Sequence, residues 1–140
     1  MIFGDKMLKK RYSFRAEFFD VDSMGVVWHG NYVKFTEMAR CRLLDEAKYN
    51  YIAMRQNGFA LPIVKMDFKF VRPVLFNDDV CVEITLQECD VLLRFGYRIL
   101  NANDEVLCIA HTTQAAVTLQ GEVIYAIPKD LKEALEKLKD

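Results

Sequence analysis

Residues able to carry out acyl chemistry gather near the start of the chain. Asp22, Gly25 and His29 fall within the segment Asp20–Asn31, directly before residues that repeat at helical spacing. Free N–H groups and the macrodipole at a helix N-terminus favour negative charge, so such an end could hold the oxygen of a polarised carbonyl. A nearby carboxylate, Asp22, could attack that carbonyl or draw a proton from water. These residue types fit hydrolysis of an acyl bond.

The same residues also fit a loop that merely caps a helix, because Asp and Gly before a helix are ordinary turn residues. His29 could equally be a hydrogen-bonded structural residue. Its neighbour Trp28, and Phe18 further back, fit the core or the wall of a pocket. Residue types alone leave both interpretations open.

The elements that must position these residues follow from hydrophobic periodicity. Apolar residues recur every three or four positions from Tyr32 to Asn57, which predicts one long helix. Asn31 is the expected N-cap of this helix, and Gly58 is placed to end it in a left-handed conformation. A second, short helix is expected after Pro128.

Alternating apolar and polar residues predict five strands. Turn-forming residues such as those at 77–79 and 101–104 separate the later strands as hairpins. The fold class is therefore α+β, an antiparallel sheet wrapped around one long central helix, in a single domain covering residues 1–140. The predicted strands span residues 12–18, 64–70, 80–86, 91–99 and 106–119.

Bulk composition excludes several classes of protein. The formal net charge is −1, and neither half carries a basic run, so nucleic acid is not an expected partner. No segment is apolar enough to span a membrane, and a cytoplasmic location is expected. Cys41, Cys81, Cys89 and Cys108 lack metal-ligand spacing and are expected to be buried free thiols.

The segment Phe19–Tyr32 resembles the active-site motif of the 4-hydroxybenzoyl-CoA thioesterase family, which has the hotdog fold. The presence of His29 is similar to the Tol-Pal-associated bacterial branch. Segments 70–80 and 111–115 resemble further blocks of the family, so the resemblance covers roughly residues 8–128.

The resemblance implies an acyl-CoA thioesterase that releases a carboxylic acid and free CoA, with no metal and no cofactor. Asp22 would be the catalytic carboxylate and Asp20 a supporting turn residue. The backbone N–H of His29 would be the oxyanion donor, with its side chain assisting. The family's active site lies between subunits, and the uncovered strand edges also favour a homodimer or homotetramer. The expected substrate-binding residues are Gly25, Val27, Trp28, Asn31 and Arg72.

Two departures from the family pattern leave the acyl group open. Phe18 stands where the branch often has a tyrosine, and the basic cluster of aryl-specific members is missing from Asp90–Leu93. The expected contacts to the CoA phosphates are Lys65, Lys69, Arg72 and Arg94. Alternative functions are an acyl-carrier-protein thioesterase and a non-catalytic acyl-CoA-binding protein. A hotdog dehydratase is disfavoured, because no histidine lies between Asn31 and Gly58.

Overall fold

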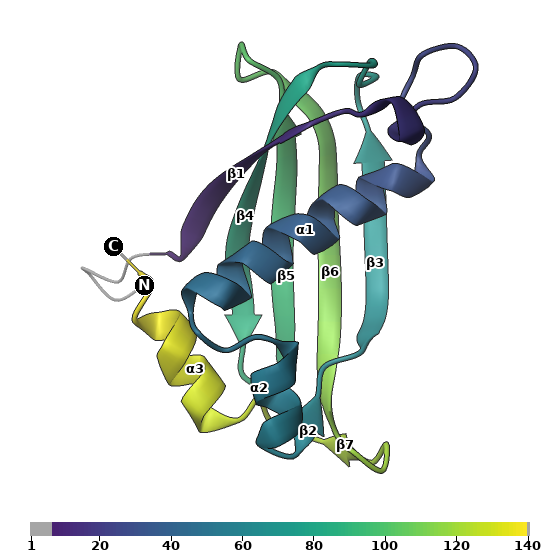
Figure 1. Ribbon diagram of the computed structural model, residues 1–140. Helices are drawn as coiled ribbons and strands as arrows, with labels where there is room; N and C mark the ends of the chain where they lie inside the picture. The colour runs from purple at the N-terminus through teal and green to yellow at the C-terminus, as the bar shows by residue number, and fades with distance from the viewer. Residues whose placement is uncertain (1–6, 140) are drawn as a thin grey trace.

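One long helix lies diagonally across the inner face of a curved antiparallel sheet in the computed structural model, which describes residues 7–139 (Figure 1). The main strands follow the order β1-β4-β5-β6-β3, which leaves β1 and β3 at the edges. Two short strands pair with the end of β6. The strands are β1 Lys9–Arg15, β2 Phe59–Ala60, β3 Ile63–Phe70, β4 Asp79–Cys89, β5 Leu92–Leu100, β6 Val106–Thr118 and β7 Val123–Ile124.

The α+β class and the antiparallel hairpins are confirmed, but the predicted count of five strands is wrong. The additional β2 and β7 are two residues each, too short to show a period-two pattern. The first strand also ends earlier than predicted. Its last residue is Arg15, and Phe18 instead begins a 3₁₀ turn, η1 (Phe18–Asp20), where its ring is 78% exposed.

The predicted single helix from Tyr32 to Asn57 is two helices, α1 (Gly30–Glu46) and α2 (Tyr51–Gln56). Lys48 adopts a left-handed φ of 56° between them, and the Asn50 side chain accepts a hydrogen bond from Ala53 N at 3.0 Å, which caps α2. The apolar spacing continues across the break, so periodicity alone could not reveal it. Gly58 does take a left-handed φ of 87°, as predicted.

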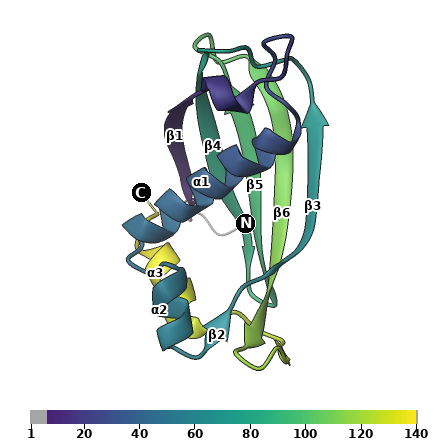
Figure 2. The ribbon, with the colours of Figure 1, turned by 45° about the vertical axis from the view of Figure 1, so that its right-hand side comes forward.

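The remaining helix, α3 (Lys129–Glu136), begins after Pro128 as predicted and buries Leu131 and Leu135. Figure 2 shows α2 and α3 side by side beyond the end of α1. The hydroxyl of Tyr49, in the α1–α2 connection, donates to Asp130 Oδ2 of α3 at 2.8 Å. The two short helices therefore close one end of the sheet.

The core lies between α1 and the inner face of the sheet. Phe35 of α1 stacks on Phe14 of β1 with ring centroids 6.4 Å apart. A buried arginine, Arg40, also points into this layer, where its guanidinium donates to the hydroxyls of Tyr51 and Tyr97 at 3.0 and 3.1 Å. Hydrogen bonds thus replace the water that this charge gives up.

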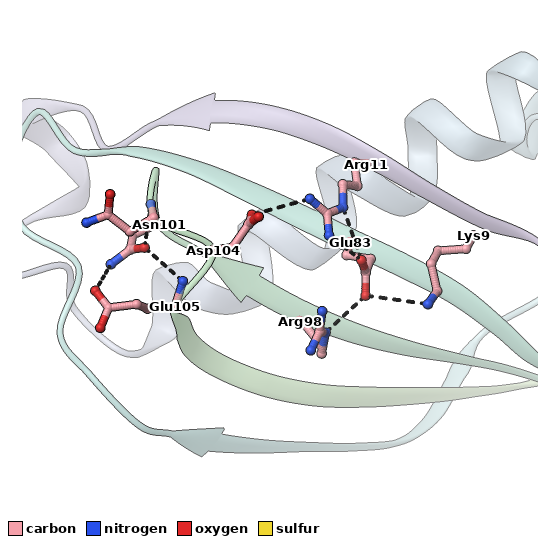
Figure 3. A network of polar contacts seen from close by, with 8 residues as sticks. Lys9, Arg11, Glu83, Arg98, Asn101, Asp104 and Glu105 are labelled. Carbon is pink, nitrogen blue, oxygen red and sulfur yellow. Dashed lines mark hydrogen bonds and ion pairs between the residues drawn. The ribbon is translucent and has the colours of Figure 1, made fainter.

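The outer face of the sheet is polar. Glu83 of β4 is almost completely buried among Lys9, Arg11 and Arg98, which come from β1 and β5 (Figure 3). Burial acts to raise the pKa of Glu83, but hydrogen bonds from Arg98 and Arg11 outweigh it and hold that pKa below its usual range. Glu83 is therefore ionised at neutral pH.

The cysteine prediction holds only in part. All four thiols are free, but only Cys108 is buried, and Cys41 is exposed on α1. Within residues 7–139, no helix combines the length and apolar character needed to cross a membrane.

Candidate active site

Asp22 lies in a tight turn that its own side chain closes. Its backbone N–H donates to Val26 O at 2.9 Å, and Gly25 N donates back to Asp22 O at 3.0 Å. The carboxylate Oδ1 accepts from Met24 N at 2.8 Å and from Val26 N at 3.3 Å. The second oxygen, Oδ2, accepts no hydrogen bond from any residue of the described chain. Asp22 is thus an exposed carboxylate with one oxygen fixed and one free for chemistry.

Gly25 has a φ of 76°, a left-handed conformation that favours glycine. A Cβ built there meets no atom of the described chain within 4 Å, so within the chain itself only the backbone conformation opposes a side chain at this position. In this segment it is Gly30, and not Gly25, at which a neighbouring side chain leaves no room for a Cβ. A Cβ there would lie 2.0 Å from the Trp28 ring, which rests on the first turn of α1. Trp28 itself is 57% exposed and is not part of the core.

Asp20 anchors the loop from beneath. It is 1% exposed, and its side chain accepts from Glu17 N at 2.9 Å and forms an ion pair with Lys34 of α1. Its carbonyl oxygen accepts from Trp28 N at 3.0 Å and from the Asn31 side chain at 2.7 Å. The supporting role expected for Asp20 therefore has a structural basis.

The predicted N-cap of the long helix needs correction. The N-cap position of α1 is His29, not Asn31, and it has a helical φ and no capping hydrogen bond from its side chain. Asn31 instead lies inside the first turn and donates its side-chain amide to Asp20 O, so it holds the loop against the helix.

The backbone N–H of His29 donates to no atom of the described residues, and it stands where a helix N-terminus leaves such groups unpaired. The imidazole is exposed and lies 5.7 Å, ring to ring, from Phe70 of β3 and 6.2 Å from Trp28. A free N–H with an imidazole beside it can stabilise an oxyanion.

A pocket of about 270 Å³ opens beside His29. Val27 and Arg72, both predicted to bind substrate, line it together with His29. Arg72 lies where β3 gives way to Pro73, and its Nη1 is 3.4 Å from Val106 O and 3.8 Å from Glu105 Oε2. The other predicted residues do not line this pocket: Asp22, Gly25 and Trp28 belong to the adjoining loop, and Asn31 lies in the first turn of α1.

Sequence reasoning missed the two aromatic walls of the pocket, Tyr32 and Phe70, whose ring centroids lie 5.0 Å apart. Both sit in regular apolar patterns that indicate core rather than a site. The hydroxyl of Tyr32 accepts from Val74 N at 3.3 Å, and burial raises the pKa of Tyr32, so the phenol stays protonated. Of the expected phosphate contacts, Lys65, Lys69 and Arg94 do not line the pocket.

The side chains and backbone N–H groups of the site include those that acyl transfer needs. Among the residues that the structure describes, no three His, Cys, Asp or Glu side chains come close enough together to hold a metal ion. The arrangement supplies a carboxylate, an unpaired N–H at a helix start, and an apolar pocket with a cation at its margin. These are the groups that stabilise and attack a carbonyl.

Residues 17–135 match the family described as the thioesterase-like superfamily. The chain belongs to that superfamily. It is 29% identical over 123 residues to the acyl-CoA thioester hydrolase YbgC of Escherichia coli, covering 86% of this chain and 91% of that one. The acyl-CoA thioesterase YbgC of Haemophilus influenzae is 29% identical over 139 residues, covering 95% and 100%. The chain is a thioester hydrolase.

Solved structures carry the same hotdog thioesterase fold. The gentisyl-coenzyme A thioesterase BH1999 superposes with a TM-score of 0.79 at 25% identity, over 90% of this chain and 99% of that one. The Synechocystis 1,4-dihydroxy-2-naphthoyl-CoA thioesterase Slr0204 superposes with a TM-score of 0.84 at 21% identity, over 91% and 95%. The hotdog fold expected from segment 19–32 is thus confirmed. The finer assignment to the 4-hydroxybenzoyl-CoA branch stays a prediction.

Proposed function

We propose that the protein hydrolyses acyl-CoA thioesters, with Asp22 as the catalytic carboxylate. The observation that carries this proposal is the Asp22 carboxylate itself. Two backbone N–H groups fix Oδ1, Oδ2 is free, and the turn stands directly before the unpaired N–H of His29. The named activities of the YbgC relatives support CoA as the thiol carrier.

In the proposed reaction the thioester carbonyl oxygen accepts a hydrogen bond from His29 N–H, which stabilises the oxyanion as the carbonyl carbon becomes tetrahedral. Asp22 acts in one of two ways. As a nucleophile it forms an acyl anhydride and expels CoA thiolate, and water then cleaves the anhydride. As a general base it takes a proton from the water that attacks. In both routes one water is consumed, and a carboxylic acid and CoA are released.

The pocket beside His29 would receive the acyl group, and Arg72 at its margin would meet a phosphate of CoA. Tyr32 and Phe70 give the pocket aromatic walls, which suit an aryl or short branched acyl group.

We further propose that two subunits build the complete site. Strand β3 is an edge strand whose inner face lies partly clear of α1 (Figures 1 and 2). Val64 and Phe70 on that face are 58% and 50% exposed. An edge with an apolar face is a surface that pairs with another chain. Asp22 does not line its own chain's pocket, so a partner's pocket could meet it.

The test is a panel of short, long, branched and aryl CoA thioesters, assayed for thiol release with the wild type and with Asp22→Asn. Thiol release from at least one CoA thioester, abolished or strongly reduced in the variant, would support the proposal. Binding of acyl-CoA without turnover of any thioester would contradict it and favour a non-catalytic binding protein. Comparing turnover of the same acyl groups on CoA and on acyl-carrier protein then shows which of the two thioesters is the better substrate.

A further inference from the structure

A shallow hollow of about 390 Å³ lies on the outer face of the sheet, away from α1. Its floor is Gly96 in the middle of β5, flanked across the sheet by Thr85 of β4 and His111 of β6. A Cβ on Gly96 would lie 2.5 Å from the Gln87 side-chain nitrogen. The side-chain amide of Gln87 therefore lies directly against Gly96 at the floor of the hollow, and the mechanism proposed above does not use this hollow.

Three of the side chains that Figure 3 shows around one another, Lys9, Glu83 and Arg98, line this hollow. Glu83 Oε1 accepts from Arg98 Nε at 3.0 Å, and Oε2 accepts from Arg11 Nε at 3.1 Å, while Lys9 Nζ is 4.0 Å away. Arg11 is also 3.3 Å from Asp104. One carboxylate thus faces three cations, and the two that line the hollow, Lys9 and Arg98, remain about half exposed.

The guanidinium of Arg98 is held in one orientation but still has N–H groups free to donate. It uses Nε on Glu83, and its two Nη nitrogens donate to no residue of the described chain. Glu83 also lines the hollow and holds Arg98 in place, but it is only 5% exposed and its single negative charge is outnumbered by the three cations around it. Planar guanidinium groups bind phosphate oxygens in pairs, and a lysine ammonium adds charge without fixed geometry.

We propose that this hollow binds a phosphate group, carried either by CoA or by a separate phosphorylated small molecule. Arg98 and Lys9 supply the charge, and the hydroxyl of Thr85 and the amide of Gln87 supply further donors. The site lies on the face of the sheet opposite to the pocket beside His29. Its occupancy can be measured without any assay of hydrolysis, so the proposal stands apart from the proposed function.

The first experiment titrates isotope-labelled protein with pyrophosphate and follows backbone amide shifts by NMR. We expect saturable shifts at Gly96 and its cross-strand neighbours, and a dissociation constant raised about fivefold or more by Arg98→Gln. The matched control is Arg15→Gln, which removes the same charge from the same face but from a residue that pairs with Asp79 outside the hollow. Gly96→Ala serves as a steric variant, since its Cβ would lie 2.5 Å from the Gln87 side-chain nitrogen and displace a donor of the proposed site.

Two arms then distinguish the source of the phosphate. If CoA is the ligand, CoA shifts the same amides and Arg98→Gln raises KM for acyl-CoA but not for acyl-pantetheine, which lacks the phosphates. If the ligand is separate, pyrophosphate shifts these amides, CoA does not, and KM is unchanged. The proposal is overturned if pyrophosphate gives no saturable shift up to about 10 mM, or if Arg15→Gln weakens binding as much as Arg98→Gln.

Discussion

Replacing Asp22 by asparagine and by alanine separates its chemistry from its role in the loop. Asparagine keeps an Oδ1 that can accept from Met24 N and Val26 N, now 2.8 and 3.3 Å away. The turn should therefore survive, and the free energy of unfolding should change by less than about 0.5 kcal/mol. Alanine removes both hydrogen bonds. Because the site is exposed and water replaces the lost partner, we expect a loss of only about 1 kcal/mol.

Activity, unlike stability, should fall strongly in both variants. Neutralising the carboxylate removes the nucleophile or base in both variants, so Asp22→Asn should lower kcat by at least ~10²-fold, which corresponds to about 2.7 kcal/mol. Asp22→Ala should be at least as inactive, with its looser turn adding to the loss.

Thiol release from the best CoA thioester measures turnover, and urea unfolding of the same preparations measures stability. Near wild-type turnover by Asp22→Asn, in protein with an unchanged unfolding midpoint, would remove Asp22 from the mechanism. An asparagine variant as unstable as the alanine variant would instead refute the account of the turn.

Four further outcomes follow from the site and the thiols. His29→Ala should reduce kcat less than Asp22→Asn does, because the backbone N–H survives; an equal loss in the same assay would make the imidazole an equal partner. Gly25→Ala should cost about 1–2 kcal/mol in urea unfolding from its left-handed φ, since no crowding opposes the Cβ; unchanged stability would count against that strain. Arg72→Ala should raise KM for CoA thioesters with kcat nearly unchanged, and an unchanged KM in intact oligomer would exclude the phosphate contact. Cys41 should react first with a thiol reagent at pH 8, whereas burial raises the pKa of Cys108 to about 12, so this thiol stays protonated and should react only on unfolding.

The sequence predicted the α+β class and the main strands from their periods, but the same continuous apolar spacing concealed the break between α1 and α2. It also failed where a partner far along the chain decides the outcome. Arg40 fits the polar side of a helix, yet it is buried because Tyr97 of β5 and Tyr51 beyond the helix break satisfy its guanidinium. Glu83 fits the exposed side of a strand, yet cations from two neighbouring strands cover it. The spacing of neighbouring residues in the sequence predicts neither of these buried environments.

In the candidate site, too, features with a local cause could be predicted and features that depend on distant residues could not. The turn at Asp22 and the glycine at 25 could be located because their cause is local: a short-range side-chain acceptor and a positive φ. Tyr32 and Phe70 meet across the fold, so patterns within each element marked them only as apolar. The role of Asn31 was misassigned for a related reason, because its acceptor, the carbonyl oxygen of Asp20, lies eleven residues earlier in the chain.

The packing of Trp28 on Gly30 has a practical consequence for work on this enzyme. The chain contains one tryptophan, so all of its indole fluorescence arises beside the unpaired N–H of His29. The ring rests on a glycine in the first turn of α1 and lies 6.2 Å from the imidazole, while more than half of it faces solvent. A ligand that excludes water there changes the polarity around the indole. The protein therefore carries a built-in optical reporter of occupancy, one that requires no label and can follow single turnovers in a stopped-flow instrument.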